Sequence, residues 1–219
     1  MKVWRLGLAL FFAAPVAAQT TAAEAIALAQ RYHDTHNGHD LAATMAFYAP
    51  DARFQLNMGR PMVNGVAAIA ELERFDVIAG SMLFPYHWRA ERTGESWLIH
   101  VDGVIESSRI FTALGLPVVV AIPNAPVLIL RDGQIVHINQ PPLRPACSSQ
   151  IIAGFSALAK WLAIDVNTKA LVDNGRLVLT TVTLPRIIDL IRVWRDSSAW
   201  RPDAAQVRAC AEPTFEKNP

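Results

Sequence analysis

The sequence has few cysteines, little net charge and none of the common nucleotide or hydrolase motifs. Its two cysteines make no Cys–His pair with credible catalytic spacing. The formal charge of the 219 residues is +1, so nucleic acid is not an expected partner. No glycine-rich phosphate loop and no nucleophile elbow is present. These absences argue against a phosphate-loop enzyme and against a serine hydrolase of the nucleophile-elbow type.

Long hydrophobic runs are also scarce, and the one at the N-terminus is short. Lys2 and Arg5 precede the apolar run from Leu6 to Ala14, and small residues follow it up to Ala18. A membrane span needs about 20 apolar residues, whereas a charged start, a short apolar run and small residues are typical of a signal peptide. Residues 1–18 are therefore predicted to be a secretory signal peptide, which indicates a periplasmic or secreted protein.

Export bears on the two cysteines, because disulfides persist in oxidising compartments. Cys147 and Cys210 are the only candidates for a pair. We expect a single disulfide between them. Two buried thiols are the alternative.

The most informative stretch runs from Gln30 to Gly65. Ala25 to His33 shows helical spacing, and Asn37-Gly38 is expected to end that helix in a left-handed conformation. Asp40 is expected to cap a second helix that continues to Pro50-Asp51. Further along, Arg53 to Met58 alternates like a strand, and Gly65 precedes a helical run from Val66 to Phe75.

This order of elements, with Tyr-Ala-Pro-Asp-Ala at Tyr48 to Ala52, resembles the opening of the nuclear transport factor 2-like superfamily, which includes SnoaL-like cyclases and ketosteroid isomerases. Leu130 to Val136 resembles the Asp-Gly-Lys-Ile hairpin before the last strand of that fold. The resemblance covers residues from about Ala22 to Pro145. It implies an α+β fold in which N-terminal helices and a curved, mostly antiparallel sheet form a cone-shaped pocket, with no cofactor expected.

The middle of the chain is rich in strand patterns. Ser81 to Glu91 and Ser96 to Ile105 are predicted strands joined by a turn at Arg92 to Glu95. Three more strands are predicted at Leu116 to Ile122, Val127 to Arg131 and Gln134 to Asn139. The last two form a hairpin on Asp132-Gly133.

The C-terminal part of the chain is predicted to be a helical extension. The prolines between Gln140 and Pro145 should end the sheet. Ser148 and Ser149 are expected to cap a helix from Gln150 to about Asp173, and Pro185 to start another. Arg176 to Leu184 between them is either a strand or a linker. The predicted organisation is a signal peptide at 1–18, a SnoaL-like domain at 19–145 and an extension at 146–219 packed on the cone, with a dimer or membrane-surface contact as its alternative role.

The resemblance also suggests candidate catalytic residues. Tyr32 stands where ketosteroid isomerases carry their oxyanion-holding tyrosine, but Leu56 stands where they carry the base, which argues against that proton shuttle. His100-Val101-Asp102 resembles the Arg-Val-Asp of limonene epoxide hydrolases, although Gln140 replaces their second Asp. Asp102, His100 and Tyr32 are thus the catalytic candidates. Strand alternation places His100 and Asp102 on the face opposite Trp97 and Ile99, so an outward or dimer-facing position is the alternative.

The histidines near the end of the first helix are of a residue type that often binds metal ions. His33 and His36 can share a helix face, but His39 lies beyond the Asn37-Gly38 break. A solvated helix end explains them more simply. No metal site is predicted.

Together these patterns predict an exported SnoaL-like domain that binds a small, mostly apolar molecule in the cone. The proposed ligand-binding side chains are aromatic or apolar: Tyr32, Phe54, Leu56, Tyr86, Trp88 and Trp97. The alternatives are a hydrolase or isomerase that uses Asp102, His100 and Tyr32, and a non-catalytic module of envelope assembly. In the last case the outer sheet face would form a homodimer.

Overall fold

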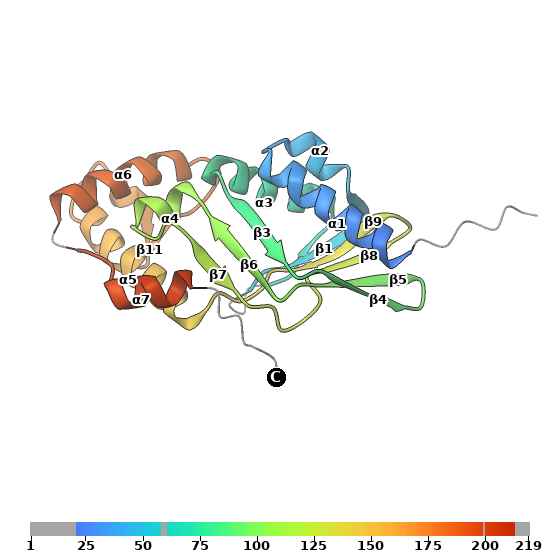
Figure 1. The fold of residues 1–219 in the computed structure, drawn as a ribbon. Coiled ribbons are helices and arrows are strands. Elements are labelled where there is room, and N and C mark those ends of the chain that lie inside the picture. Colours follow the sequence, from blue (N-terminus) through green and yellow to red (C-terminus); the bar gives the residue numbers. More distant parts are fainter. Residues whose placement is uncertain (1–20, 58–60, 199, 213–219) are drawn as a thin grey trace, which may run out of the picture.

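The computed structural model describes residues 21–57, 61–198 and 200–212 (Figure 1). The predicted signal peptide and Met58 lie outside these residues. The helices are α1 (Ala22–Asn37), α2 (Leu41–Met45), α3 (Val66–Ala79), α4 (Arg109–Ala113), α5 (Pro145–Leu162), α6 (Leu184–Ser197) and α7 (Ala204–Ala211), with a 3-10 turn at Lys169–Leu171. None of the helices in the described ranges is long and apolar enough to span a bilayer.

The strands form one large sheet and two small ones. They are β1 (Tyr48–Gln55), β2 (Val63–Asn64), β3 (Met82–Tyr86), β4 (Arg89–Thr93), β5 (Ser96–His100), β6 (Gly103–Ser107), β7 (Val119–Ala121), β8 (Leu128–Arg131), β9 (Gln134–Asn139), β10 (Val172–Asp173) and β11 (Arg176–Leu177). The sheet orders are β2-β1-β9-β8-β5-β4, β3-β6-β7 and β10-β11. The β1–β9 pair is parallel, and the other strand pairs are antiparallel. The predicted α+β class with a mostly antiparallel sheet is confirmed.

The two long strands predicted between Ser81 and Ile105 are each broken in two. The chain bends at His87, which has a positive φ of 56°, and opposite it Asp102 N–H donates to Tyr86 O at 3.0 Å. The outer half of this hairpin, β4–β5, joins the large sheet, while β3–β6 joins the small one (Figure 1). The bend shifts the side-chain alternation. Val101 and Val104, which would face opposite sides of a continuous strand, are both buried.

The second half of the bend depends on a glycine. A Cβ built on Gly103 would lie 2.2 Å from the Tyr86 hydroxyl oxygen. Only a residue without a side chain leaves room for the phenol ring at this point. The ring of Tyr86 therefore lies directly over Gly103, its partner on the neighbouring strand.

The N-terminal helices differ from expectation at their ends. Gly38 has a right-handed φ of −74°, and the left-handed residue is His39, with φ 56°. The second helix ends at Met45, as α2, while Tyr48 already belongs to β1. Pro50 is tolerated in β1 because its pairing with β9 is irregular between Tyr48 and Arg53. As predicted, Asp40 caps α2 by accepting from Ala43 N–H at 3.0 Å.

A first apolar core fills the space between α1, α3 and the large sheet. Its buried residues are Ala25, Ala29, Tyr32, Tyr48, Ala52, Ile69, Ile99, Val101, Val104, Ala121, Val127, Leu128, Leu130, Ile135 and Ile138. The helices lie on one face of the sheet (Figure 1). This arrangement brings the C-terminal half of α1 against α3, where the polar residues described below meet.

A second apolar core joins the C-terminal helices to α4 and β7. Its members include Leu114, Leu116, Val119, Leu158, Leu162, Leu184, Ile187, Ile188, Ile191 and Trp194. Helix α5 begins at Pro145 with Arg144 as its N-cap, so the prediction that Ser148 and Ser149 cap it was wrong. It ends at Leu162, well before Asp173, and the predicted strand or linker after Asn174-Gly175 contains only the short β11.

The predicted disulfide is present. Cys147 on α5 and Cys210 on α7 are bonded across a Cα–Cα distance of 4.8 Å, and both residues are fully buried. The disulfide fixes α7, a helix that was not predicted from the sequence, to α5.

Candidate functional site

A buried polar cluster lies between α1 and α3 within the otherwise apolar first core. Ile69, Glu73 and Asp76 follow one another at helical spacing on α3, so they share the face that packs toward α1 and the sheet. Glu73 is only 3% exposed. A carboxylate at such a depth is costly unless hydrogen bonds compensate it.

The Glu73 carboxylate receives hydrogen bonds at both oxygens. Its Oε1 accepts from the Tyr32 hydroxyl at 2.9 Å and from the Tyr48 hydroxyl. Its Oε2 lies 2.9 Å from His36 Nδ1. The two tyrosine hydroxyls are themselves 2.9 Å apart. One side chain of α3 thus holds together α1 and the first residue of β1.

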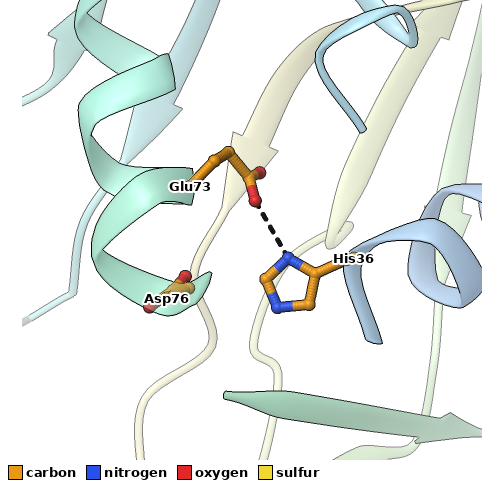
Figure 2. Close-up of side chains that lie close together, drawn as sticks. All are labelled: His36, Glu73 and Asp76. Carbon is orange, nitrogen blue, oxygen red and sulfur yellow. Dashed lines mark hydrogen bonds and ion pairs between the residues drawn. The ribbon is translucent and has the colours of Figure 1, made fainter. Parts of the chain in front are cut away.

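Two more carboxyl groups face this centre. Figure 2 shows that the Glu73 side chain points at the imidazole of His36 on α1, and that Asp76 lies one turn further along α3. One ligand atom each from His36, Glu73 and Asp76 lie within 4.8 Å of one another. Glu106 on β6 is held by the Ser81 hydroxyl, which donates to its Oε1 at 3.2 Å. The cluster therefore gathers three acidic side chains around one histidine.

Hydrogen bonding and charge decide the protonation of the central pair. Burial works to raise the pKa of Glu73, but the hydrogen bond and charge of His36 and the two tyrosine hydroxyls outweigh it, and the pKa is lowered. Burial works to lower the pKa of His36, but Glu73 raises it, with support from Asp76 and Glu106. The pair is thus stabilised as an ion pair.

The outer carboxyls behave in the opposite way. Burial raises the pKa of Asp76 to about 8, and the charges of Glu106 and Glu73 add to this rise against the effect of His36. Burial likewise raises the pKa of Glu106 to about 7, although Ser81 and His36 oppose it. Burial is also the main reason that the pKa values of Tyr32 and Tyr48 are raised well above 10. The tyrosines are therefore neutral donors at physiological pH.

The expectation of a solvated helix end at His33 and His36 was wrong. The two residues are 8% and 4% exposed. His33 Nδ1 lies 2.8 Å from Ala29 O, and the ring of His33 meets that of Trp88 edge to face at 5.3 Å. Both histidines belong to the interior because α1 packs on the sheet along this side.

The burial of His33 predicts a loss of stability in acid. Burial lowers its pKa from 6.5 to about 4, with a smaller lowering by His36 and opposing effects of Ala29 O, Glu73 and Asp34. Between pH 6.5 and 4, His33 therefore binds a proton in the unfolded chain but not in the folded chain. The folded chain loses stability relative to the unfolded chain as the pH drops from 6.5 towards 4. The expected loss is about 3 kcal/mol.

The measurement is the free energy of unfolding by urea between pH 4 and 7. His33→Gln should show a flatter fall than the wild-type chain over this window. His39→Gln serves as the control, because His39 lies at the same helix end but is more exposed. Equal slopes for all three proteins would contradict the expectation.

The proposed catalytic group does not assemble. The Asp102 side chain is 42% exposed and pairs with His87 at 2.9 Å and Arg89 at 3.1 Å, at the bend of the hairpin. His100 lies nearest to a different carboxylate, Glu91, at 3.8 Å. Tyr32 contacts neither, since its hydroxyl is engaged by Tyr48 and Glu73. Asp102 therefore has the outward position that was the alternative prediction.

The proposed ligand-binding side chains lie in different settings. Phe54, Trp88 and Trp97 are half-buried and pack against the edge of the first core. Leu56 follows the end of β1, and Tyr86 lies against Gly103. Among the described residues, one surface pocket of about 390 Å³ lies between α4 and α6, lined by Arg109, Arg192 and Arg195 among others, and another of about 440 Å³ lies at β10–β11. None of the six proposed residues lines either pocket.

The sequence reading missed Glu73, Asp76 and Glu106. A signal for the first two was present, because Ile69, Glu73 and Asp76 recur at the spacing of one helix face. Charged residues within the apolar stripe of a predicted helix indicate a buried polar site. For Glu106 no such signal exists, since the segment from Glu106 to Leu114 fits both helix and strand.

Comparison with known proteins gives distant structural likenesses. No protein-family model matches the chain, and no curated protein matches its sequence. Among solved structures, the epoxide hydrolase/cyclase-like enzyme SalBIII, which acts in pyran ring formation in the polyether salinomycin, is 16% identical with a TM-score of 0.37, over 55% of this chain and 90% of that one.

Two further solved structures are of similar distance. A protein named as a ketosteroid isomerase from Kribbella flavida is 22% identical, with a TM-score of 0.42, over 57% of this chain and 87% of that one. A protein named as a polyketide cyclase from Xanthomonas campestris is 27% identical, with a TM-score of 0.40, over 52% and 87%. These likenesses concern the fold and carry no activity to this chain. The three neighbours are named as an epoxide hydrolase/cyclase-like enzyme, a ketosteroid isomerase and a polyketide cyclase.

Proposed function

We propose that this chain is an exported SnoaL-like domain that binds a small, mostly apolar molecule at the cone, next to the polar cluster around Glu73. The observation that carries the proposal is the concentration of oriented polar groups in an apolar core. Tyr32, Tyr48 and His36 all point at one carboxylate. Small-molecule sites usually combine apolar walls with a few polar groups of this kind.

The apolar wall of the proposed site lies beside α1. Trp88 is half-buried and touches His33, which is the residue next to Tyr32 on α1. Phe54 and Trp97 are likewise half-buried at the edge of the first core. Partly accessible aromatic side chains offer large contact areas to an apolar ligand. Trp88, which touches the residue next to Tyr32, is the central apolar contact of the proposed site.

Export is a separate part of the proposal. The charged and apolar pattern of residues 1–18 supports it. The Cys147–Cys210 disulfide is compatible with an oxidising compartment. A hydrolase or isomerase based on Asp102 is not proposed, because that carboxylate is exposed and paired with His87 and Arg89.

Native mass spectrometry of the chain purified from its own host tests ligand binding. We expect a fraction of the protein to carry the extra mass of a small molecule that is released on denaturation. Trp88→Ala should lower this fraction several-fold by removing the apolar contact. Ile152→Ala, which shortens an exposed apolar side chain on α5, should leave it unchanged.

A titration with the apolar dye 1-anilinonaphthalene-8-sulfonate gives a second readout. The wild-type chain should bind it saturably, and Trp88→Ala more weakly. A bare mass in the native spectrum together with dye binding that is equal in the wild type, Trp88→Ala and Ile152→Ala would reject the proposed site.

A further inference from the structure

The donor atoms of the buried cluster have a composition suited to a metal ion. His36 supplies an imidazole nitrogen, and Glu73 and Asp76 supply carboxylate oxygens, all within 4.8 Å of one another. The ligand atoms around one zinc ion lie about 3–3.5 Å apart when each bond is 2.0–2.1 Å long. A contraction of about 1.3–1.8 Å from the 4.8 Å limit would bring the three donors to zinc spacing.

The second observation is an unsatisfied ring nitrogen. The imidazole of His36 is 3% exposed, and its Nδ1 is engaged by Glu73 Oε2. Its Nε2 is buried and has no hydrogen-bond partner within the described chain. Buried polar atoms are normally paired, so an unpaired one needs an explanation such as an ion or a water molecule.

The Asp76 carboxyl is also available. No hydrogen bond to this side chain is formed among the described residues, whereas Glu73 takes part in two hydrogen bonds at Oε1 and one at Oε2, and Glu106 accepts from Ser81. Within the same residues, neither Lys nor Arg pairs with any of the three carboxyls, and His36 is the one cationic partner of Glu73. Figure 2 shows Asp76 on α3 next to Glu73 and the imidazole of His36. The cluster is thus acidic, partly unsatisfied and enclosed.

From this geometry we infer that His36, Glu73 and Asp76 form a binding site for a divalent first-row transition metal ion, with Zn²⁺ as the first candidate. Imidazole favours zinc, iron, copper and nickel, and the two carboxylates are compatible with zinc. Three protein ligands leave one position of a four-coordinate ion open to water or to a ligand. The inference does not depend on the small-molecule proposal, because an ion can occupy the cluster in either case.

The test measures the metal content of the untagged chain, stripped with EDTA and then incubated with Zn²⁺. After gel filtration, inductively coupled plasma mass spectrometry should find one zinc ion per chain. Asp76→Asn should bind Zn²⁺ at least tenfold more weakly. This variant keeps the size of the side chain and breaks no hydrogen bond of the described chain, so it should fold. Circular dichroism verifies the fold.

The matched control is Asp102→Asn. Asp102 also lies 2.9 Å from a histidine nitrogen, that of His87, but on the surface. This variant should retain one zinc ion, and Zn²⁺ should raise the melting temperature of the wild type and of Asp102→Asn but not of Asp76→Asn. The inference fails if the wild type retains no zinc, if Asp76→Asn retains as much as the wild type, or if Asp102→Asn is the variant that loses it.

Discussion

Glu73→Met is expected to lower the free energy of unfolding by about 3–5 kcal/mol, the range found when one partner of a buried ion pair is removed. Methionine fills a similar volume but accepts no hydrogen bond of comparable strength. The hydroxyls of Tyr32 and Tyr48 and the Nδ1 of His36 would lose the carboxylate that they now share. Each donor left unpaired in the interior costs about 1–3 kcal/mol. Urea unfolding followed by tryptophan fluorescence, with EDTA present, measures the change.

Glu71→Met provides the control on the same helix. Glu71 is 57% exposed and pairs with Arg74, and exposed pairs of this kind contribute about 0–1 kcal/mol. The Glu71 variant should therefore unfold almost like the wild type. If the two variants differed by less than about 1 kcal/mol, the polar network would not be the stabilising feature that its geometry indicates.

Replacing both Cys147 and Cys210 by alanine is expected to cost about 4 kcal/mol of stability. The disulfide joins residues separated by 63 positions. In the chain-entropy description it restricts the unfolded chain over that whole loop. Because the loop contains α6 and most of the second core, the loss should fall on the C-terminal extension first. Urea unfolding of the oxidised wild type against the double variant gives the difference.

The wild type treated with dithiothreitol is the companion measurement and should unfold at the same urea concentration as the double variant. Mass spectrometry under non-reducing conditions should show the oxidised wild type two hydrogens lighter than the reduced chain. Two free thiols in the chain purified without reductant, or a stability difference below about 1 kcal/mol, would contradict this prediction.

Elements whose signals are local could be predicted from the sequence. The hairpin of β8 and β9 forms on Asp132-Gly133, both of which have positive φ, as the two-residue turn requires. Helix α6 begins at Leu184 with Pro185 in its first turn, and its stripe Ile187, Ile188 and Ile191 is buried. Helix α1 ends at Asn37 as expected. In each case the residues that specify the element lie within the element or next to it.

The bend of the hairpin and the polar cluster could not be predicted from local sequence signals. The alternation from Ser96 to Ile105 looks continuous, and only the pairing across Tyr86 and Asp102 shows where the strand changes sheet. The partners of Glu73 come from positions 25 to 41 residues away. Their convergence depends on how α1 and α3 pack, which no local pattern records. Asp102 was favoured for its neighbours in sequence, whereas its actual partners His87 and Arg89 follow from the bend.

The second core shows how the C-terminal extension is joined to the rest of the molecule. Leu114, Leu116 and Val119 precede Pro145, yet they are fully covered by packing with α5 and α6. The packing is therefore continuous across Pro145, where the family resemblance stops. Helices α5, α6 and α7 pack against α4 and β7 in the second core, and Leu143 packs against both cores, so the extension is built into the rest of the fold.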